Sequence, residues 1–314
     1  MTGALSNFLW TYQNLIHSLG VNGLLALAMY VVLAVGQLSL GQAAFMGIGA
    51  YASALLTLRL HWPFWAVLPA ACAAPAAFAL AIGAPTLRLS GVYLAIATIG
   101  LGEVLRGVYL NVDLFGGALG LSGIPLEAQI WQIYGLLGLS ILVLWLVGRS
   151  RVGRAMEAMR EDEMAAEVMG VDVRRYRLGA LLAAAVLSGL AGALDAHSSS
   201  FIGPNSYGFE PAVTILSFAL LGGIGNPVAP VLGAFILTLL PELLRGFADA
   251  RMVVNGTIIV IVVLFLPRGV VPARMRKARG AAPGPRQGQS PLEPFTNRGL
   301  GPPGPGGVEG QRPS

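Results

Sequence analysis

The stretch RSRVGRAMEAMREDEMAAEVMGVDVRRYR, at Arg149–Arg177, decides how the rest of the chain is organised. It holds thirteen of the chain's 35 charged residues, and long apolar segments flank it on both sides. A plain connection between two membrane spans needs only a few residues, whereas this stretch is nearly thirty residues long, contains no proline and favours helix. We therefore expect a water-exposed surface that a soluble partner can bind.

The composition places the flanking segments in a membrane. Of the 314 residues, 55% are hydrophobic and only 11% are charged, whereas a soluble domain is about a quarter charged. Apolar segments fall at 14–36, 41–60, 64–84, 90–110, 131–148, 178–201, 210–224, 228–246 and 251–267. The sequence predicts an all-α polytopic membrane protein with about eight to ten transmembrane segments. Two of them, 41–60 and 210–224, are Gly-rich or short, and they are expected to be broken or re-entrant.

The basic residues indicate which ends of the spans face the cytoplasm. Seven of the 20 basic residues lie in Arg149–Arg177 and eight lie from Arg268 onward, whereas residues 1–58 contain none. Because cytoplasmic loops carry an excess of Lys and Arg, we expect an external N-terminus and a cytoplasmic C-terminus. Anionic membrane lipid is a sufficient partner for these basic residues, and no nucleic-acid partner is expected despite the net charge of +5.

The chain divides at about residue 271 into two regions of different composition. Residues 1–271 form the expected transmembrane domain. Residues 272–314 are first basic and then dominated by Pro and Gly, so they cannot bury a core and are expected to form a disordered cytoplasmic tail. The single cysteine, Cys72, excludes a disulfide framework and a cysteine-based metal cluster.

Within the charged stretch, the sequence predicts two short helices. Asp162 can cap a second helix that ends at Gly170, and Asp172 can cap the helix that returns to the membrane. The apolar residues at helical spacing in the first helix are Val152, Met156 and Met159. On these residues alone two roles remain open. The hairpin can insert into a groove of a soluble protein, or it can lie as an amphipathic loop on the lipid surface.

Charged residues inside the spans also allow a structural and a functional interpretation. Glu103 with Arg106, and Glu242 with Arg245, are three residues apart and can pair on one helix. Because an unpaired charge in lipid is costly, we favour self-neutralised pairs over a lining of the solute path. His197 lies near the outer end of its span and is expected to face external water.

The sequence shows no motif of an enzyme. GIGAYA at Gly47–Ala52 has the glycine spacing of a dinucleotide-binding loop, but no strand precedes it, and that interpretation is rejected. Neither a phosphate-binding loop, nor a nucleophile with a base, nor a His/Cys ligand set is visible, so no cofactor and no metal is expected. The glycines favour close helix approach or broken helices, whose ends can meet a zwitterionic solute. Candidate residues of a translocation path beside these breaks are Ser39, Gln42, Gly47, Gly223 and Asn226.

Several long motifs resemble those of the permease subunits of bacterial ABC importers for branched-chain amino acids, and the LivM type is closer than the LivH type. The similar stretches are GQLSLGQAAFMGIGAY (Gly36–Tyr51), GGALGLSGIP (Gly116–Pro125), RVGRAMEAMREDEMAAEVMGVDVRRYRL (Arg151–Leu178), GPNSYGFEP (Gly203–Pro211), LLGGIGNPVAPVLGAF (Leu220–Phe235), LLPELLR (Leu239–Arg245) and LFLPRGV (Leu264–Val270). The resemblance runs in order from about residue 23 to residue 271. One departure is Gln42, where the family's motif usually carries His.

This resemblance implies an ABC importer permease fold in the bacterial inner membrane, with import of branched-chain or other small amino acids by alternating access. It implies a homologous second permease, two cytoplasmic ATP-binding subunits that hydrolyse ATP in place of this chain, and an external solute-binding protein. It favours the docking role for the charged stretch as a coupling loop. The expected contact residues are Arg151, Gly153, Arg154, Ala155, Met159, Arg160, Glu161, Asp162, Ala165, Ala166 and Gly170. The alternatives are a permease of the same superfamily for urea, amides or sugars, and an ATP-independent secondary transporter or channel.

Overall fold

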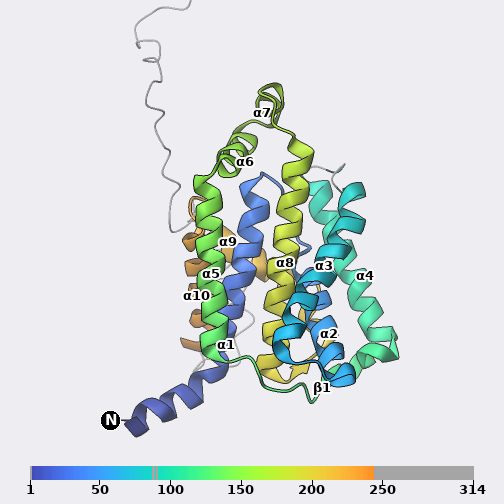
Figure 1. Cartoon of the computed structure of the whole chain (residues 1–314), viewed down its shortest axis with the longest axis vertical. Coiled ribbons are helices and arrows are strands. Elements are labelled where there is room, and N and C mark those ends of the chain that lie inside the picture. Colours follow the sequence, from blue (N-terminus) through green and yellow to red (C-terminus); the bar gives the residue numbers. More distant parts are fainter. Residues whose placement is uncertain (1, 87–88, 90, 244–314) are drawn as a thin grey trace, which may run out of the picture. The chain divides into compact units, whose positions relative to one another are not determined.

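The computed structural model describes residues 2–86, 89 and 91–243 (Figure 1). The apolar segment expected at 251–267, the division at residue 271 and the tail at 272–314 lie outside these residues. Arg245, the expected partner of Glu242, lies outside them as well.

Within the described residues, six helices are long and apolar enough to cross a membrane. They are α1 (Thr2–Ala34), α2 (Gln42–Leu60), α3 (Phe64–Thr86), α4 (Val92–Asn111), α5 (Ile130–Arg149) and α8 (Val173–Ser199). Two shorter apolar helices follow, α9 (Phe209–Gly222) and α10 (Val228–Leu243). Two short helices between α5 and α8 are α6 (Arg151–Glu161) and α7 (Glu163–Val168). The expected all-α polytopic fold is confirmed, and the bounds agree with the apolar segments to within about five residues, except that α1 begins at Thr2, well before the segment expected from residue 14.

Helix α8 is the centre of the packing, and it lies against α1, α2 and α3 (Figure 1). Its closest neighbour is α2, because glycines let the two backbones approach each other. A Cβ added at Gly49 would collide with the backbone of Gly189, and one added at Gly192 would collide with the backbone of Met46. Small residues serve this purpose in membranes, where close packing replaces the hydrophobic effect between helices. We call this contact, around Met46, Gly49, Gly189 and Gly192, the α2–α8 seam.

The chain leaves helical geometry between α1 and α2. Residues 35–41 are non-helical and mostly buried, although they lie among membrane helices. The Leu40 N–H donates to Thr98 Oγ1 of α4 at 2.9 Å, so a protein group satisfies this backbone amide, as irregular chain at membrane depth requires. The break expected in 41–60 therefore precedes the helix. Helix α2 itself is continuous from Gln42 to Leu60.

Helix α9 covers most of the segment 210–224, which was expected to be broken or re-entrant, and it is continuous but short. It has 14 residues, which span about 21 Å at the α-helical rise, against about 30 Å for the hydrocarbon core. Gly223, with a φ of +96°, ends the helix, and α10 then packs back against α9.

The two ends of the helix bundle carry different structures. The α6–α7 hairpin lies at one end, where α5 finishes and α8 begins (Figure 1). At the opposite end, β1 (Leu121–Ser122) pairs antiparallel with β2 (Phe201–Ile202). Three short 3₁₀ helices accompany this pair, at Asp113–Phe115 (η1), Gly117–Leu119 (η2) and Pro204–Tyr207 (η3).

Candidate functional site

The α6–α7 hairpin is built from short helices that polar side chains cap. Ser150 caps α6, Asp162 caps α7 and Asp172 caps α8, each through a side-chain oxygen that accepts a backbone N–H at 3.0–3.1 Å. The expected caps at Asp162 and Asp172 are thus confirmed. Gly170 follows α7 with a φ of +87°, a conformation that favours glycine.

The inner face of the hairpin is apolar and fixes it to the membrane helices. Met159 of α6 and Ala166 of α7 are buried in one cluster with Val31 of α1, with Val35 directly after α1 and with Val173 of α8. The burial of these two residues leaves them little surface for a partner, although both belong to the predicted contact set. Their role in the structure is to hold the hairpin against α1 and α8.

The other predicted contact residues remain accessible to different degrees. Gly153, Ala155 and Arg160 are half-buried. The exposed members of the set are Arg151, Arg154, Glu161, Asp162, Ala165 and Gly170. The structure therefore brings the predicted residues together on one hairpin, but only part of the set lies on its outer surface.

The outer face of α7 carries apolar residues that the sequence prediction missed. Met164, Val168 and Met169 have exposed fractions of 78%, 88% and 84%. A charged hairpin in water would ordinarily show polar side chains here, so three neighbouring apolar ones indicate a binding surface. We call them the α7 apolar tip. The sequence EMAAEVM could have predicted this apolar surface. On a helix, Met164 and Val168 share one face, and they must point outward when Ala166, on the opposite face, points inward.

Two features make the hairpin a rigid attachment. A Cβ at Gly153 would collide with the backbone of Gly148, so glycine permits the sharp corner between α5 and α6. At the other side, Arg177 Nη2 of α8 pairs with Glu163 Oε2 of α7 at 2.5 Å, and the Arg177 side chain is mostly buried. Both helices that enter the membrane are thus tied directly to the hairpin.

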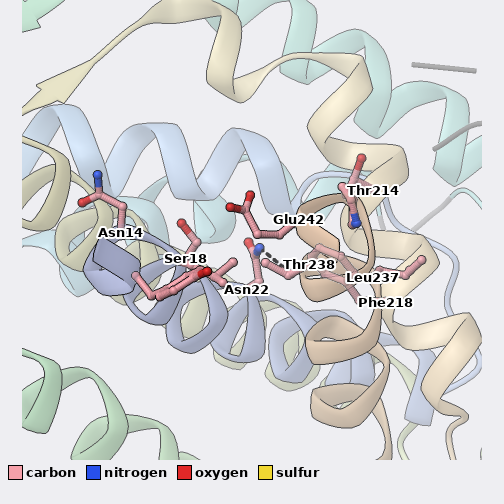
Figure 2. A pocket seen from close by; sticks show the side chains of 11 residues that line it. Asn14, Ser18, Asn22, Thr214, Phe218, Leu237, Thr238 and Glu242 are labelled. Carbon is pink, nitrogen blue, oxygen red and sulfur yellow. Dashed lines mark hydrogen bonds between the residues drawn. The ribbon is translucent and has the colours of Figure 1, made fainter. Parts of the chain in front are cut away.

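A second candidate feature is a cavity of about 470 Å³ between α1, α9 and α10. Its lining is mixed, with amide, hydroxyl and carboxyl groups beside apolar ones (Figure 2). The lining residues are Tyr12, Asn14, Leu15, Ser18, Asn22, Thr214, Phe218, Leu237, Thr238, Pro241 and Glu242. Asn22 Nδ2 of α1 donates to Thr238 Oγ1 of α10 at 2.9 Å, which ties the two walls together.

None of the five residues predicted for a translocation path lines this cavity. Ser39 is buried within the non-helical segment, Gln42 is buried at the start of α2, and Gly47 packs against the ring of Tyr207. Gly223 and Asn226 belong to the turn between α9 and α10, where the Asn226 side chain accepts the Val228 N–H at 3.3 Å. Their assignment to a solute path stays a prediction.

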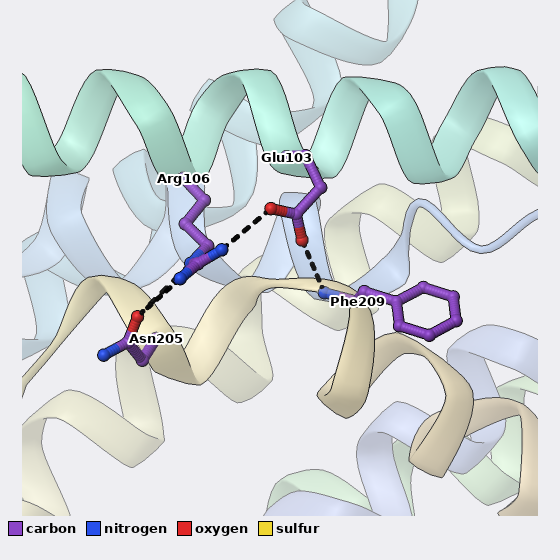
Figure 3. Close-up of polar contacts among 4 residues, drawn as sticks. All are labelled: Glu103, Arg106, Asn205 and Phe209. Carbon is purple, nitrogen blue, oxygen red and sulfur yellow. Dashed lines mark hydrogen bonds and ion pairs between the residues drawn. The ribbon is translucent and has the colours of Figure 1, made fainter.

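The expected pair of Glu103 and Arg106 is present and reaches further than the sequence indicated (Figure 3). Arg106 Nη1 donates to Glu103 Oε2 at 2.9 Å. The same guanidinium donates to Asn205 Oδ1 through Nε at 3.2 Å and Nη2 at 3.0 Å. Glu103 Oε1 accepts the Phe209 N–H at 2.9 Å, so a carboxylate of α4 caps the start of α9. The pair therefore fixes the loop before α9 in addition to neutralising itself.

The expectation that His197 faces external water is wrong. Its side chain is fully buried, with Nε2 at 3.1 Å from Thr57 Oγ1 of α2 and Nδ1 at 2.9 Å from the Ala193 carbonyl oxygen. A carbonyl oxygen only accepts, so Nδ1 carries the proton of the neutral ring, and Nε2 can accept from the Thr57 hydroxyl, which also lies 3.0 Å from the Ser53 carbonyl oxygen. His197 is thus a polar link between α8 and α2.

The amino-acid sequence is similar to a family of known proteins. Residues 11–265 match the family described as a branched-chain amino acid transport system permease component. The chain is 33% identical over 300 residues to the high-affinity branched-chain amino acid transport system permease protein LivM of Escherichia coli (strain K12), a match that covers 83% of this chain and 71% of the relative. It is 27% identical over 284 residues to the ribose import permease protein RbsC of Escherichia coli (strain K12), with 80% and 84% covered. No solved structure matches the chain.

The family match includes the α6–α7 hairpin and all of the cavity lining. Six described helices are long and apolar enough to span a membrane, as a permease needs. The chain therefore belongs to the family of permease components of branched-chain amino acid transport systems.

Proposed function

We propose that the chain is the membrane-spanning subunit of an ATP-driven importer of branched-chain or other small amino acids. ATP hydrolysis takes place on separate cytoplasmic subunits, and the α6–α7 hairpin is the surface that they bind. The observation that carries this assignment is the exposed α7 apolar tip on a hairpin whose other face is buried against α1 and α8.

The hairpin is suited to transmit movement into the membrane. Met159 and Ala166 hold it against the end of α1 and the start of α8, and the Arg177–Glu163 ion pair ties α7 to α8. Helix α8 in turn packs along α2 through the α2–α8 seam. A displacement of the hairpin by a nucleotide-loaded partner therefore shifts α8 and α2 together. Such a partner favours one conformation only if it binds the two conformations with different affinity, and alternating access follows from that difference.

The assembly that this function requires has a homologous second permease, two ATP-binding subunits and an external solute-binding protein. Relatives of this chain support the paired permeases, since LivM and LivH permease proteins of one high-affinity transport system both match it. In this arrangement the hairpin and the C-terminal tail lie in the cytoplasm, and the N-terminus and the β1–β2 pair lie outside the inner membrane.

The test replaces the α7 apolar tip without touching the buried face of the hairpin. The double variant Met164→Gln with Met169→Gln keeps side-chain length and helix propensity but removes apolar surface. In proteoliposomes with the partner subunits, leucine-stimulated ATP hydrolysis and leucine uptake should fall by at least about tenfold, which corresponds to the loss of one or two strong interface contacts. Protein abundance in the membrane should not change.

Leu119→Gln is the matched control, because Leu119 has an exposed fraction of 88% at the opposite end of the helix bundle. It should leave both activities at the level of the unmodified protein. Full activity of the double variant would contradict the docking role and would favour a hairpin on the lipid surface of an ATP-independent transporter. Exchanging Arg160 with Glu161 is a poorer test, because Arg160 is half-buried whereas Glu161 is exposed.

A further inference from the structure

The loop between β2 and α9 lies at the end of the helix bundle that carries the β1–β2 pair. It runs from Gly203 to Gly208, contains η3, and contacts α2, α4 and α9. Tyr207 of this loop is only 1% exposed, so its side chain is inserted among the helices. Gly47 of α2 makes room for it, because a Cβ added at Gly47 would lie 2.9 Å from the Tyr207 ring. The loop is thus anchored in the bundle by one large side chain.

Tyr207 packs against two further tyrosines. Its ring centroid lies 5.8 Å from that of Tyr51 of α2 and 6.4 Å from that of Tyr109 of α4, and the latter two rings stack at 4.2 Å. We call these three residues the tyrosine cluster. All three are at most 3% exposed, yet none of their hydroxyls has a hydrogen-bond partner within the described residues. A buried polar group without a partner destabilises the conformation that buries it, and three in one cluster call for a functional explanation.

Phenylalanine would fill the same space without this cost. Phe115 does so beside the same rings, with its centroid 5.3 Å from those of Tyr51 and Tyr109. A tyrosine hydroxyl stabilises the protein only in a conformation where a hydrogen-bonding group or water reaches it. The three hydroxyls therefore favour a second conformation, in which Tyr207 has left the cluster and water hydrates them.

Two polar contacts of α4 hold the loop in its described position (Figure 3). The Arg106 guanidinium donates to Asn205 within the loop. The Glu103 carboxylate accepts the N–H of Phe209 directly after it. We call Glu103, Arg106 and Asn205 the latch. Gly208 leaves space for the latch, because a Cβ added there would lie 3.0 Å from the side chains of both Glu103 and Arg106.

The latch is partly exposed although it lies on a membrane helix. Glu103 precedes Asn111, the last residue of α4, by eight residues, or about 12 Å along the helix. The side chains of Glu103 and Arg106 are 39% and 37% exposed. Charged groups at this depth are unfavourable against hydrocarbon, so they face water or protein. Water can also replace the contacts of the latch when the loop moves, which makes its opening reversible.

We propose that the loop from Gly203 to Gly208 is a gate that closes the solute path, with Tyr207 as the side chain that fills the path and the latch as its fastening. The assignment rests on the proposed import function, which places this end of the bundle outside the membrane. In the open state Asn205 releases Arg106, Tyr207 leaves the tyrosine cluster, and the solute passes between α2 and α4. The glycines at the two ends of the loop absorb the change in backbone angles.

The first experiment removes one hydroxyl from the closed gate. Tyr207→Phe keeps the ring but no longer buries an unpartnered hydroxyl, so the half-aggregation temperature in detergent should rise by about 2 °C or more. The same change removes the hydration that favours the open state. Leucine uptake by proteoliposomes with the partner subunits should therefore fall about fivefold.

Tyr134→Phe on α5 is the control, because the Tyr134 hydroxyl donates to the Ile16 carbonyl oxygen at 3.0 Å. This variant should lose stability and keep its uptake per folded protein. A Tyr207→Phe variant that loses stability, or that does not accumulate, would show that its hydroxyl is satisfied in the closed state. Unchanged uptake in Tyr207→Phe would equally overturn the gate.

The second experiment fastens the loop covalently. In a Cys72→Ala background, Arg106→Cys and Asn205→Cys place two thiols across the latch, and a short bifunctional methanethiosulfonate reagent joins them. Crosslinking should abolish leucine uptake, and reduction with dithiothreitol should restore it to the level before crosslinking. Uptake that continues in the crosslinked protein would disprove the movement of the loop.

A second cysteine pair controls for the crosslink itself. Ser122 and Phe201 are opposite each other in β1 and β2, on the other side of Gly203 from the loop. The same reagent should join cysteines at these two positions without changing uptake, because β2 precedes the moving part. Loss of uptake in both crosslinked pairs would show that the whole end of the bundle moves and would contradict a gate confined to the loop.

Failure of the gate is separate from failure of the proposed function. The crosslink acts on the solute path however the transport is driven, whereas the variants of the α7 apolar tip act on ATP hydrolysis. Uptake through a crosslinked loop together with uncoupled tip variants would disprove only the gate. Uptake that the crosslink blocks, together with fully active tip variants, would disprove only the coupling role.

Discussion

The α2–α8 seam is a contact between two membrane helices, and so is the contact of α1 with α10 beside the cavity, around Asn22 and Thr238, which we call the α1–α10 wall. The two contacts differ in the side chains that form them. In the seam, glycines bring the backbones so close that an added Cβ would collide. In the wall, amide, hydroxyl and carboxyl groups surround a cavity of about 470 Å³. A threonine nevertheless takes part in a hydrogen bond across each contact, Thr57 with Nε2 of His197 in the seam and Thr238, which accepts from Asn22 Nδ2, in the wall.

The difference indicates that the seam contributes mainly to the stability of the fold, whereas the wall leaves space that transport can use. A dry contact of small residues tolerates no added volume and no lost hydrogen-bond partner. A contact beside a polar cavity tolerates both, because water can fill space and satisfy a donor. Changes in the seam should therefore lower the amount of folded protein, whereas changes in the wall should alter transport in folded protein.

The largest effect is expected from Gly192→Leu in the seam. The new side chain would collide with the Met46 backbone, and overpacking of this kind costs about 1–3 kcal/mol, or more when backbone must move. The amount of protein in the membrane and its half-aggregation temperature in detergent should both fall strongly. Gly138→Leu on α5, where nothing lies within 4 Å, is the control and should have little effect. Equal behaviour of the two variants would show that the seam is not tightly packed.

An intermediate effect is expected from Thr57→Val. The substitution keeps volume but leaves Nε2 of the buried His197 without its hydrogen bond, which costs about 1–3 kcal/mol. The half-aggregation temperature should fall by several degrees. Adding His197→Leu should restore part of the loss, because the orphaned nitrogen is then removed. A double variant as unstable as the sum of the two single variants would argue against the hydrogen bond.

The smallest effect on stability is expected from Thr238→Val, the same substitution in the wall. The hydrogen bond to Asn22 is lost, but water in the cavity can replace it, so the cost should stay near the average of about 0.6 kcal/mol for such bonds in membranes. The half-aggregation temperature should change by less than in Thr57→Val. A Thr238→Val variant that loses as much stability as Thr57→Val would show that the wall is as dry as the seam.

Most of the membrane helices could be predicted from the sequence, because the length and the apolar composition of a segment are enough to identify each one. The charged stretch at Arg149–Arg177 indicated the hairpin, and Asp162 and Asp172 indicated its helix starts, since capping is a local property of the chain. The pair of Glu103 and Arg106 was predictable for the same reason, because both residues lie on one helix turn. Such features need no knowledge of which helices become neighbours.

The candidate sites were harder to predict, because they depend on contacts between distant segments. Burial of His197 follows from the approach of α2 and α8, which sequence spacing does not encode. Asn22 of α1 and Thr238 of α10 meet beside the cavity although they are 216 residues apart in the sequence. The sequence prediction placed the solute path near the glycine-rich breaks instead, at Ser39 and Gln42. Polar residues spaced four apart from Asn14 to Asn22 were visible in the sequence and are the signal that could have indicated the cavity.

The hydrogen bond between Leu40 and Thr98 has a consequence for the order of biosynthesis. Thr98 enters the chain 58 residues after Leu40, so the non-helical segment between α1 and α2 has no partner from α4 while α1 and α2 are being made. An unsatisfied amide in lipid is costly, and these two helices therefore cannot reach their final positions as an independent pair. Helices α1 and α2 therefore have to wait, in a water-accessible or assisted state, until α4 has been made and has joined them.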